Sequence, residues 1–99
     1  MVNGFMKTIE GFKLRKLGNE YILVGESMEL INFNKMITLN ETAGFLWQQA
    51  EKSSSAHGGF TAAELCKALC DEYEVSPEQA MTDVENTISS WLEAGVVAQ

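Results

Sequence analysis

The stretch Ile37-Thr-Leu-Asn-Glu-Thr-Ala-Gly-Phe-Leu-Trp47 decides the fold, because a strand-like pattern ends there and a helical pattern begins. Asn40 lies at the junction and can cap a helix, since its side-chain oxygen can accept a hydrogen bond from a backbone N–H of the first turn. The residues on one stripe of that helix are Ala43, Leu46, Trp47 and Ala50. The sequence therefore predicts strands before Asn40 and helices after it.

Before Asn40, apolar residues partly follow the period of two that is typical of strands. The segments concerned are residues 12–17, 21–24, 29–33 and 36–39. Gly18-Asn19 separates the first two segments and Asn34-Lys35 the last two, which predicts two hairpins, with Asn34 tolerating a positive φ. We expect an antiparallel sheet of three to four strands.

After Asn40, the first helix is expected to end near Glu51 or Lys52. Residues 52–59 are rich in serine and glycine, which favour turns, and they predict a loop. Thr61-Ala-Ala-Glu64 then matches a capping box and predicts the start of a second helix. Its apolar stripe consists of Leu65, Cys66, Leu69 and Tyr73.

A third helix is predicted from Ser76-Pro77-Glu78-Gln79, a second capping box with proline at the first helical position. Gly95 is its expected C-terminal cap. The stripe consists of Met81, Val84, Ile88, Trp91 and Leu92, and both tryptophans of the chain are expected in the core. The predicted fold is α+β and winged-helix-like, with an N-terminal antiparallel sheet of three to four strands followed by three helices.

The chain has 99 residues, 45% of them hydrophobic, which suffices for one domain but not two. We assign this domain to residues 12–97 and expect residues 1–11 to be a flexible segment, with Met1 or Met6 as the start. No apolar run approaches the roughly 20 residues that cross a bilayer, and the N-terminus lacks a signal peptide's apolar core. The sequence therefore predicts a cytoplasmic protein without a membrane partner.

Charge is unevenly distributed along the chain. Residues 1–39 hold five basic and four acidic groups, and residues 40–99 hold two basic and ten acidic groups, so the net charges of +1 and −8 give −7. Nucleic acid is a poor partner for so anionic a helical half. A basic peptide or a basic patch on an enzyme fits the charge better, although an acidic surface also serves solubility alone.

The residue types that carry catalysis do not form a recognisable constellation. Cys66 and Cys70 are one helical turn apart, too few for a structural metal site and poorly placed for a disulfide. His57, the one histidine, lies in the predicted serine and glycine loop rather than on a rigid scaffold. We therefore expect a protein that is not an enzyme and needs no cofactor or metal.

Three sequence features together resemble one family. They are Leu39-Asn40-x-Thr42-Ala43-x-x-Leu46-Trp47, Asp83-Val84, and Gly95-Val96-Val97. The chain resembles PqqD-like proteins, typified by pyrroloquinoline quinone biosynthesis protein D and known as recognition elements for precursors of ribosomally made, post-translationally modified peptides. The resemblance implies a non-catalytic adaptor that binds the precursor's leader and presents it to a modifying enzyme, such as a radical SAM protein or a leader peptidase.

In this family the leader is understood to add as an antiparallel strand to the outer strand of the sheet, against the third helix. The resemblance therefore implies peptide-binding residues on both elements. The candidates are Ile31, Phe33, Met36, Ile37, Thr38, Ala80, Asp83, Val84, Thr87 and Trp91. Ordinary core packing is the alternative for the apolar members, and a solvated helix face is the alternative for Asp83.

Two other functions remain open from the sequence. The turn between the second and third helices resembles that of a winged-helix DNA-binding regulator, although the third helix carries no Lys or Arg. The chain could also be a structural subunit of a larger complex. An exposed sheet edge further permits strand exchange and thus a homodimer.

Overall fold

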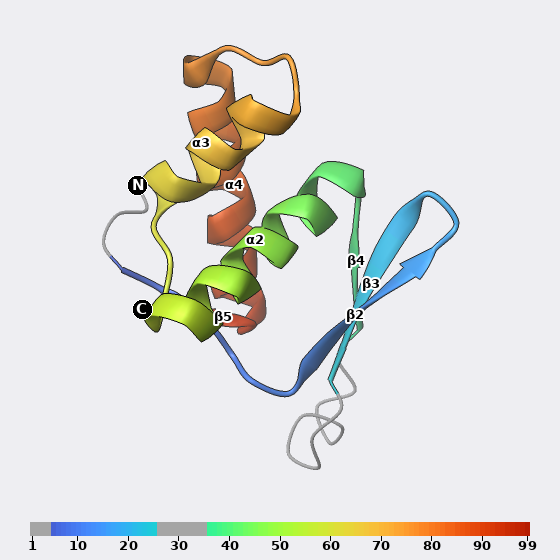
Figure 1. The fold of residues 1–99 in the computed structure, drawn as a ribbon. Coiled ribbons are helices and arrows are strands. Elements are labelled where there is room, and N and C mark those ends of the chain that lie inside the picture. The colour runs from blue at the N-terminus through green and yellow to red at the C-terminus, as the bar shows by residue number, and fades with distance from the viewer. Residues whose placement is uncertain (1–4, 26–35) are drawn as a thin grey trace.

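The computed structural model of the chain describes residues 5–25 and 36–99. A three-stranded sheet precedes three helices, which confirms the predicted α+β order, and two short strands join the ends of the domain. In Figure 1, α2 lies between this sheet and α3. The elements are β1 Lys7–Thr8, β2 Phe12–Leu17, β3 Glu20–Gly25, β4 Met36–Leu39, α2 Glu41–His57, α3 Ala62–Glu72, α4 Pro77–Ala94 and β5 Val97–Ala98.

The sheet is antiparallel in the order β2-β3-β4. The predicted hairpin of β2 and β3 is confirmed, and Gly18 takes a φ of 65° in its turn. The strand predicted over 29–33 and its turn at Asn34 lie outside the described residues. Within the described part of the chain β4 pairs with β3, and Ile37 is opposite Leu23.

The prediction that the first helix ends near Glu51 or Lys52 is wrong, because α2 continues to His57. The loop predicted from residue 52 is wrong for residues 52–57, which include neither glycine nor proline and whose helix is stabilised by contacts with distant residues. The Ser54 hydroxyl accepts a hydrogen bond from the Thr8 N–H at 3.1 Å, and Ser53 donates to Glu64. The helix ends where Gly58 adopts a left-handed φ of 80°.

The remaining helix boundaries follow the predicted capping residues. Asn40 accepts from Ala43 N–H at 2.8 Å, and Thr61 and Glu64 form the complete capping box. At α4, Ser76 accepts from Gln79 N–H at 3.2 Å, but the second half of the predicted box is replaced. The Gln79 amide instead donates to the Asp83 carboxylate at 2.9 Å, one turn further along α4.

The prediction of a flexible segment over residues 1–11 is wrong for residues 6–9, which pair with other parts of the domain. Met6 is only 1% exposed and exchanges backbone hydrogen bonds with Phe60, at 2.9 and 2.6 Å. β1 pairs with β5, and Ile9 N–H donates to the Val96 carbonyl at 2.9 Å. Residues 7–9 are therefore held by backbone hydrogen bonds to the C-terminal residues 96–98.

The centre of the core is a pair of tryptophans from α2 and α4. The Trp47 and Trp91 rings meet edge to face with centroids 5.2 Å apart, and both side chains are buried as predicted. Trp47 Nε1 finds no hydrogen-bond partner among the described residues. Glu51 lies one turn further along α2, and burial raises the pKa of its carboxyl group. The nearby Trp47 N–H has a smaller, lowering effect on this pKa and is not within hydrogen-bond geometry. The contact between the Trp47 and Trp91 rings holds α4 against α2.

Candidate functional site

In the part of the sheet that the structure describes, the two outer strands, β2 and β4, differ in charge. β2 carries Lys13, Arg15 and Lys16, all exposed, whereas β4 consists of Met-Ile-Thr-Leu and has no charged side chain. In an antiparallel pair, alternate residues direct their backbone N–H and C=O away from the partner strand. Within residues 5–25 and 36–99, β3 is the one strand that pairs with β4, so the other edge of β4 presents the backbone polar groups of uncharged residues.

Two neighbouring hollows lie between the end of β4, the start of α2 and one face of α4. The first has a volume of about 270 Å³ and is lined by Thr38, Leu39, Asn40, Ala43, Asn86, Thr87, Ser90 and Trp91. The second has a volume of about 300 Å³ and is lined by Asn40, Thr42, Ala43, Asp83, Asn86 and Thr87. Because four residues line both, the hollows form one depression, which we call the β4–α4 groove.

The lining of the β4–α4 groove is mostly small and polar. Amide and hydroxyl side chains predominate, and the apolar members of the lining are Leu39, Ala43 and the buried Trp91. Asp83 supplies one carboxylate, half-buried, with Oδ1 accepting from Gln79. Among the residues described, no Lys, Arg or His lines either hollow.

The groove brings together part of the predicted site. Thr38, Asp83, Thr87 and Trp91 line it. Ile37 is half-buried and packs against the core, while Met36 begins β4.

Other predicted site residues lie elsewhere. Ala80 and Val84 are 0% exposed and belong to the core, in line with the packing alternative. Ile31 and Phe33 lie outside the described residues.

Several groove residues were missed by the sequence prediction. They are Leu39, Asn40, Thr42, Ala43, Asn86 and Ser90. Asn86 and Ser90 follow Asp83 and Thr87 at the spacing of three and four that defines one helical face, so extending that face would have found them. Asn40 was assigned to capping alone, and it performs that role while also lining the groove.

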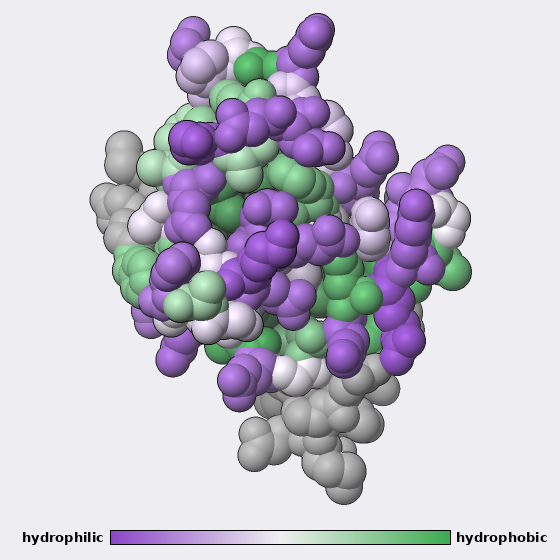
Figure 2. All heavy atoms as spheres, in the orientation of Figure 1, coloured by the Kyte–Doolittle hydropathy of each residue, from purple (hydrophilic) through white to green (hydrophobic). Residues whose placement is uncertain are grey.

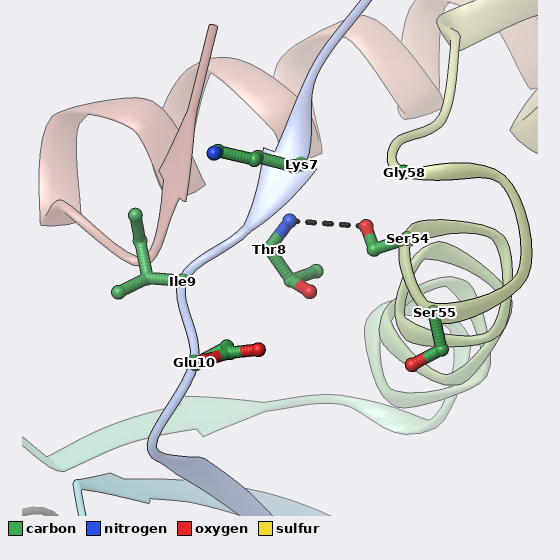
Figure 3. Close-up of a pocket in the computed structure, with 7 residues that line it drawn as sticks. All are labelled: Lys7, Thr8, Ile9, Glu10, Ser54, Ser55 and Gly58. Atoms are coloured by element: carbon green, nitrogen blue, oxygen red, sulfur yellow. Dashed lines mark hydrogen bonds between the residues drawn. The ribbon is translucent and has the colours of Figure 1, made fainter.

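Two further hollows lie near the C-terminal half of α2. One of about 510 Å³ is formed where β1 crosses α2, and Figure 3 shows the Thr8 N–H directed at the Ser54 hydroxyl within it. Another of about 630 Å³ is a shallow depression on α2 around Glu51 and Ser55. In Figure 2, hydrophilic side chains cover much of the face that includes α2. Neither hollow adjoins the β4 edge.

The two cysteines are suited to packing rather than to reactivity. Both are free and half-buried, and Cys66 Sγ lies 3.7 Å from the Pro77 carbonyl oxygen. Burial raises the pKa of the Cys66 thiol, and Cys70 raises it further, so the neutral thiol is favoured. Within the described residues, no three His, Cys, Asp or Glu side chains gather to hold a metal ion.

Comparison with known proteins assigns the chain to a family. The family model described as Coenzyme PQQ synthesis protein D (PqqD) matches residues 20–97, from β3 to β5. The chain therefore belongs to the PqqD family. No curated protein matches it.

The fold is also similar to that of a solved structure described as TbiB1 in complex with the TbiA(beta) leader peptide. The TM-score is 0.66 at 15% sequence identity, over 92% of this chain and 93% of that one. The described part of this chain contains no helix long and apolar enough to cross a membrane.

Proposed function

We propose that this protein is a non-catalytic adaptor that captures the leader of a ribosomally synthesised precursor peptide by strand addition to β4. The observation that carries the proposal is that β4, an outer strand among those the structure describes, has no charged side chain and ends at the β4–α4 groove. Family membership and the fold shared with TbiB1, a protein solved in complex with a leader peptide, support it. The peptide would continue the sheet, and alternate side chains would enter the groove.

The charge difference between the two outer strands favours β4 over β2 as the acceptor. Lysines on an edge strand disfavour pairing with a further strand, because a strand added there would partly remove their charges from water. Lys13, Arg15 and Lys16 give β2 that character. Residues Met36–Leu39 carry no charged side chain, so an incoming strand would meet the smaller electrostatic cost at β4.

The backbone alone provides a moderate part of the binding free energy. β4 has four residues, and about two of them point their N–H and C=O outward. About four hydrogen bonds at roughly 0.5–1.5 kcal/mol each give about 2–6 kcal/mol. Ordering a flexible peptide opposes this gain, so specific affinity depends on the side chains that enter the groove.

We further propose that the adaptor presents the bound precursor to a separate modifying enzyme, of the radical SAM or leader peptidase type. The groove's hydroxyls, amides and apolar edges suit it to holding an extended chain in one register. Binding at β4 would leave the remainder of the precursor free to reach an active site on the partner. This division of roles makes the protein a positioning factor rather than the catalyst.

A DNA-binding regulator is the less favoured function. α4, the helix that would enter the major groove, carries Glu78, Asp83, Glu85 and Glu93 and no Lys or Arg. Docking it on phosphates would bring like charges together without the counterion release that drives such binding. Tight binding to genomic DNA fragments in a gel-shift assay at low salt would support the regulator instead.

The proposal is tested with short peptides encoded by reading frames adjacent to this protein's gene, which are screened for binding; the leader of a peptide that binds is then synthesised with N-methylation at single positions. N-methylation removes a backbone donor while leaving the side chain unchanged. We expect affinity to fall at alternate positions within the paired segment, by roughly 2- to 10-fold each, because only alternate amides face β4. Equal effects at consecutive positions, or no binding of the parent peptide, would overturn strand addition.

A further inference from the structure

The charge of the β4–α4 groove points to a specific feature of its occupant. Resting on the proposed function, we infer that the bound segment carries a Lys or Arg just before the residues that pair with β4, and that Asp83 selects it. Among the described residues that line the two hollows, Asp83 carries the one charged side chain. It stands at the end of the groove beyond Leu39, next to the start of α2.

The environment of Asp83 suits a cation. The carboxylate is half-buried, and Gln79 engages Oδ1, which holds the side chain in place. Asn86 and the Thr42 and Thr87 hydroxyls line the same hollow and can accept further N–H groups. An ammonium or guanidinium placed there gains charge-assisted hydrogen bonds, whereas a carboxylate would be repelled.

The surroundings strengthen this selection. Residues 40–99 carry a net charge of −8, so the helical half attracts cations as a whole. The described side chain that binds Asp83 is a neutral amide. A basic side chain of the peptide would therefore compensate a charge that the lining of the groove leaves without a cationic partner.

The direction of the strand fixes where that basic residue lies in the peptide. β4 runs from Met36 to Leu39, so an antiparallel strand begins beside Leu39 and ends beside Met36. The hollow with Asp83 lies beyond Leu39, where the peptide enters. Side chains of a strand point to the same face at every second residue. One peptide residue would face the first hollow, which Leu39 and Trp91 line, and the basic residue would lie about two positions before it in the peptide sequence.

The inference is tested by selecting random short peptides displayed on phage against three immobilised proteins: the wild type, D83N and E85Q. Asp83→Asn keeps the shape and can still accept from Gln79. Glu85→Gln removes the same charge from α4 at a position that does not line the groove. We expect peptides selected by the wild type and by E85Q to be enriched in Lys or Arg at one fixed position, and those selected by D83N to lose that enrichment.

Synthetic copies of the selected peptides provide the quantitative arm. They should bind D83N roughly 3- to 10-fold more weakly than the wild type, and the difference should shrink at high salt. Peptides that bind at β4 without a basic residue, or equal enrichment by D83N, would overturn the role of Asp83 while leaving strand addition intact. Failure of the wild type to select any peptide that perturbs β4 amides would instead count against the proposed function.

Discussion

The substitution Gly44→Ala separates local helix preference from tertiary packing in this fold. Gly44 lies buried in α2, and a Cβ built there would overlap the Tyr21 ring, with Cε2 and Cγ both at 2.7 Å. In an exposed helix, replacing glycine by alanine stabilises by about 1 kcal/mol. Here the ring must move, and overpacking of this kind costs about 1–3 kcal/mol.

The net effect follows from the difference between these two contributions. We expect Gly44→Ala to lower the free energy of unfolding by about 1 kcal/mol, within a range of about 0–2. Tyr21 is only partly buried, so its ring can shift toward solvent and keep the cost in that range. Urea unfolding followed by tryptophan fluorescence measures the change, since both tryptophans lie in the core.

A double mutant tests the cause. With the ring removed by Tyr21→Ala, the same Gly44→Ala change should become stabilising by about 1 kcal/mol, because only the helix preference remains. A sign that does not reverse between the two backgrounds would refute the assigned contact. Stabilisation by Gly44→Ala alone would show that α2 and β3 are packed less closely than described.

Three further changes probe the packing around α2. Trp47→Ala should cost about 3–5 kcal/mol in urea unfolding, because it removes a fully buried ring that packs against Trp91. Ser54→Ala should cost about 1 kcal/mol and speed hydrogen exchange of the Thr8 amide, which loses its acceptor, whereas an unchanged exchange rate would contradict that contact. Because burial raises the pKa of Glu51, the ionised carboxylate opposes folding; Glu51→Gln should therefore stabilise at about pH 7 and lose this advantage below about pH 4, a trend that thermal unfolding across pH would reveal.

The elements set by local rules could be predicted from the sequence. Asn40, Thr61, Ser76 and Gly95 each cap a helix as expected, because a capping hydrogen bond or a left-handed residue involves only neighbours in the chain. The buried Trp47 also followed from helical spacing. The fold class rests on these features.

The features that depend on distant partners could not be predicted in the same way. The last turns of α2 are stabilised by Thr8, far earlier in the chain, and Met6 is buried through its pairing with Phe60. Neither contact leaves a periodic pattern. In the groove, Asn86 and Ser90 resemble a solvated helix face until the fold places β4 and the start of α2 beside them.

Which edge of the sheet receives the peptide is tested most directly by residue-resolved amide chemical shifts, recorded while the precursor's leader is titrated into the protein. The account predicts saturable changes at the β4 amides of residues 36–39 and along α4 at Asp83, Asn86, Thr87 and Ser90, with the β2 amides of residues 12–17 unmoved. Changes centred on β2, with β4 unperturbed at saturation, would contradict it.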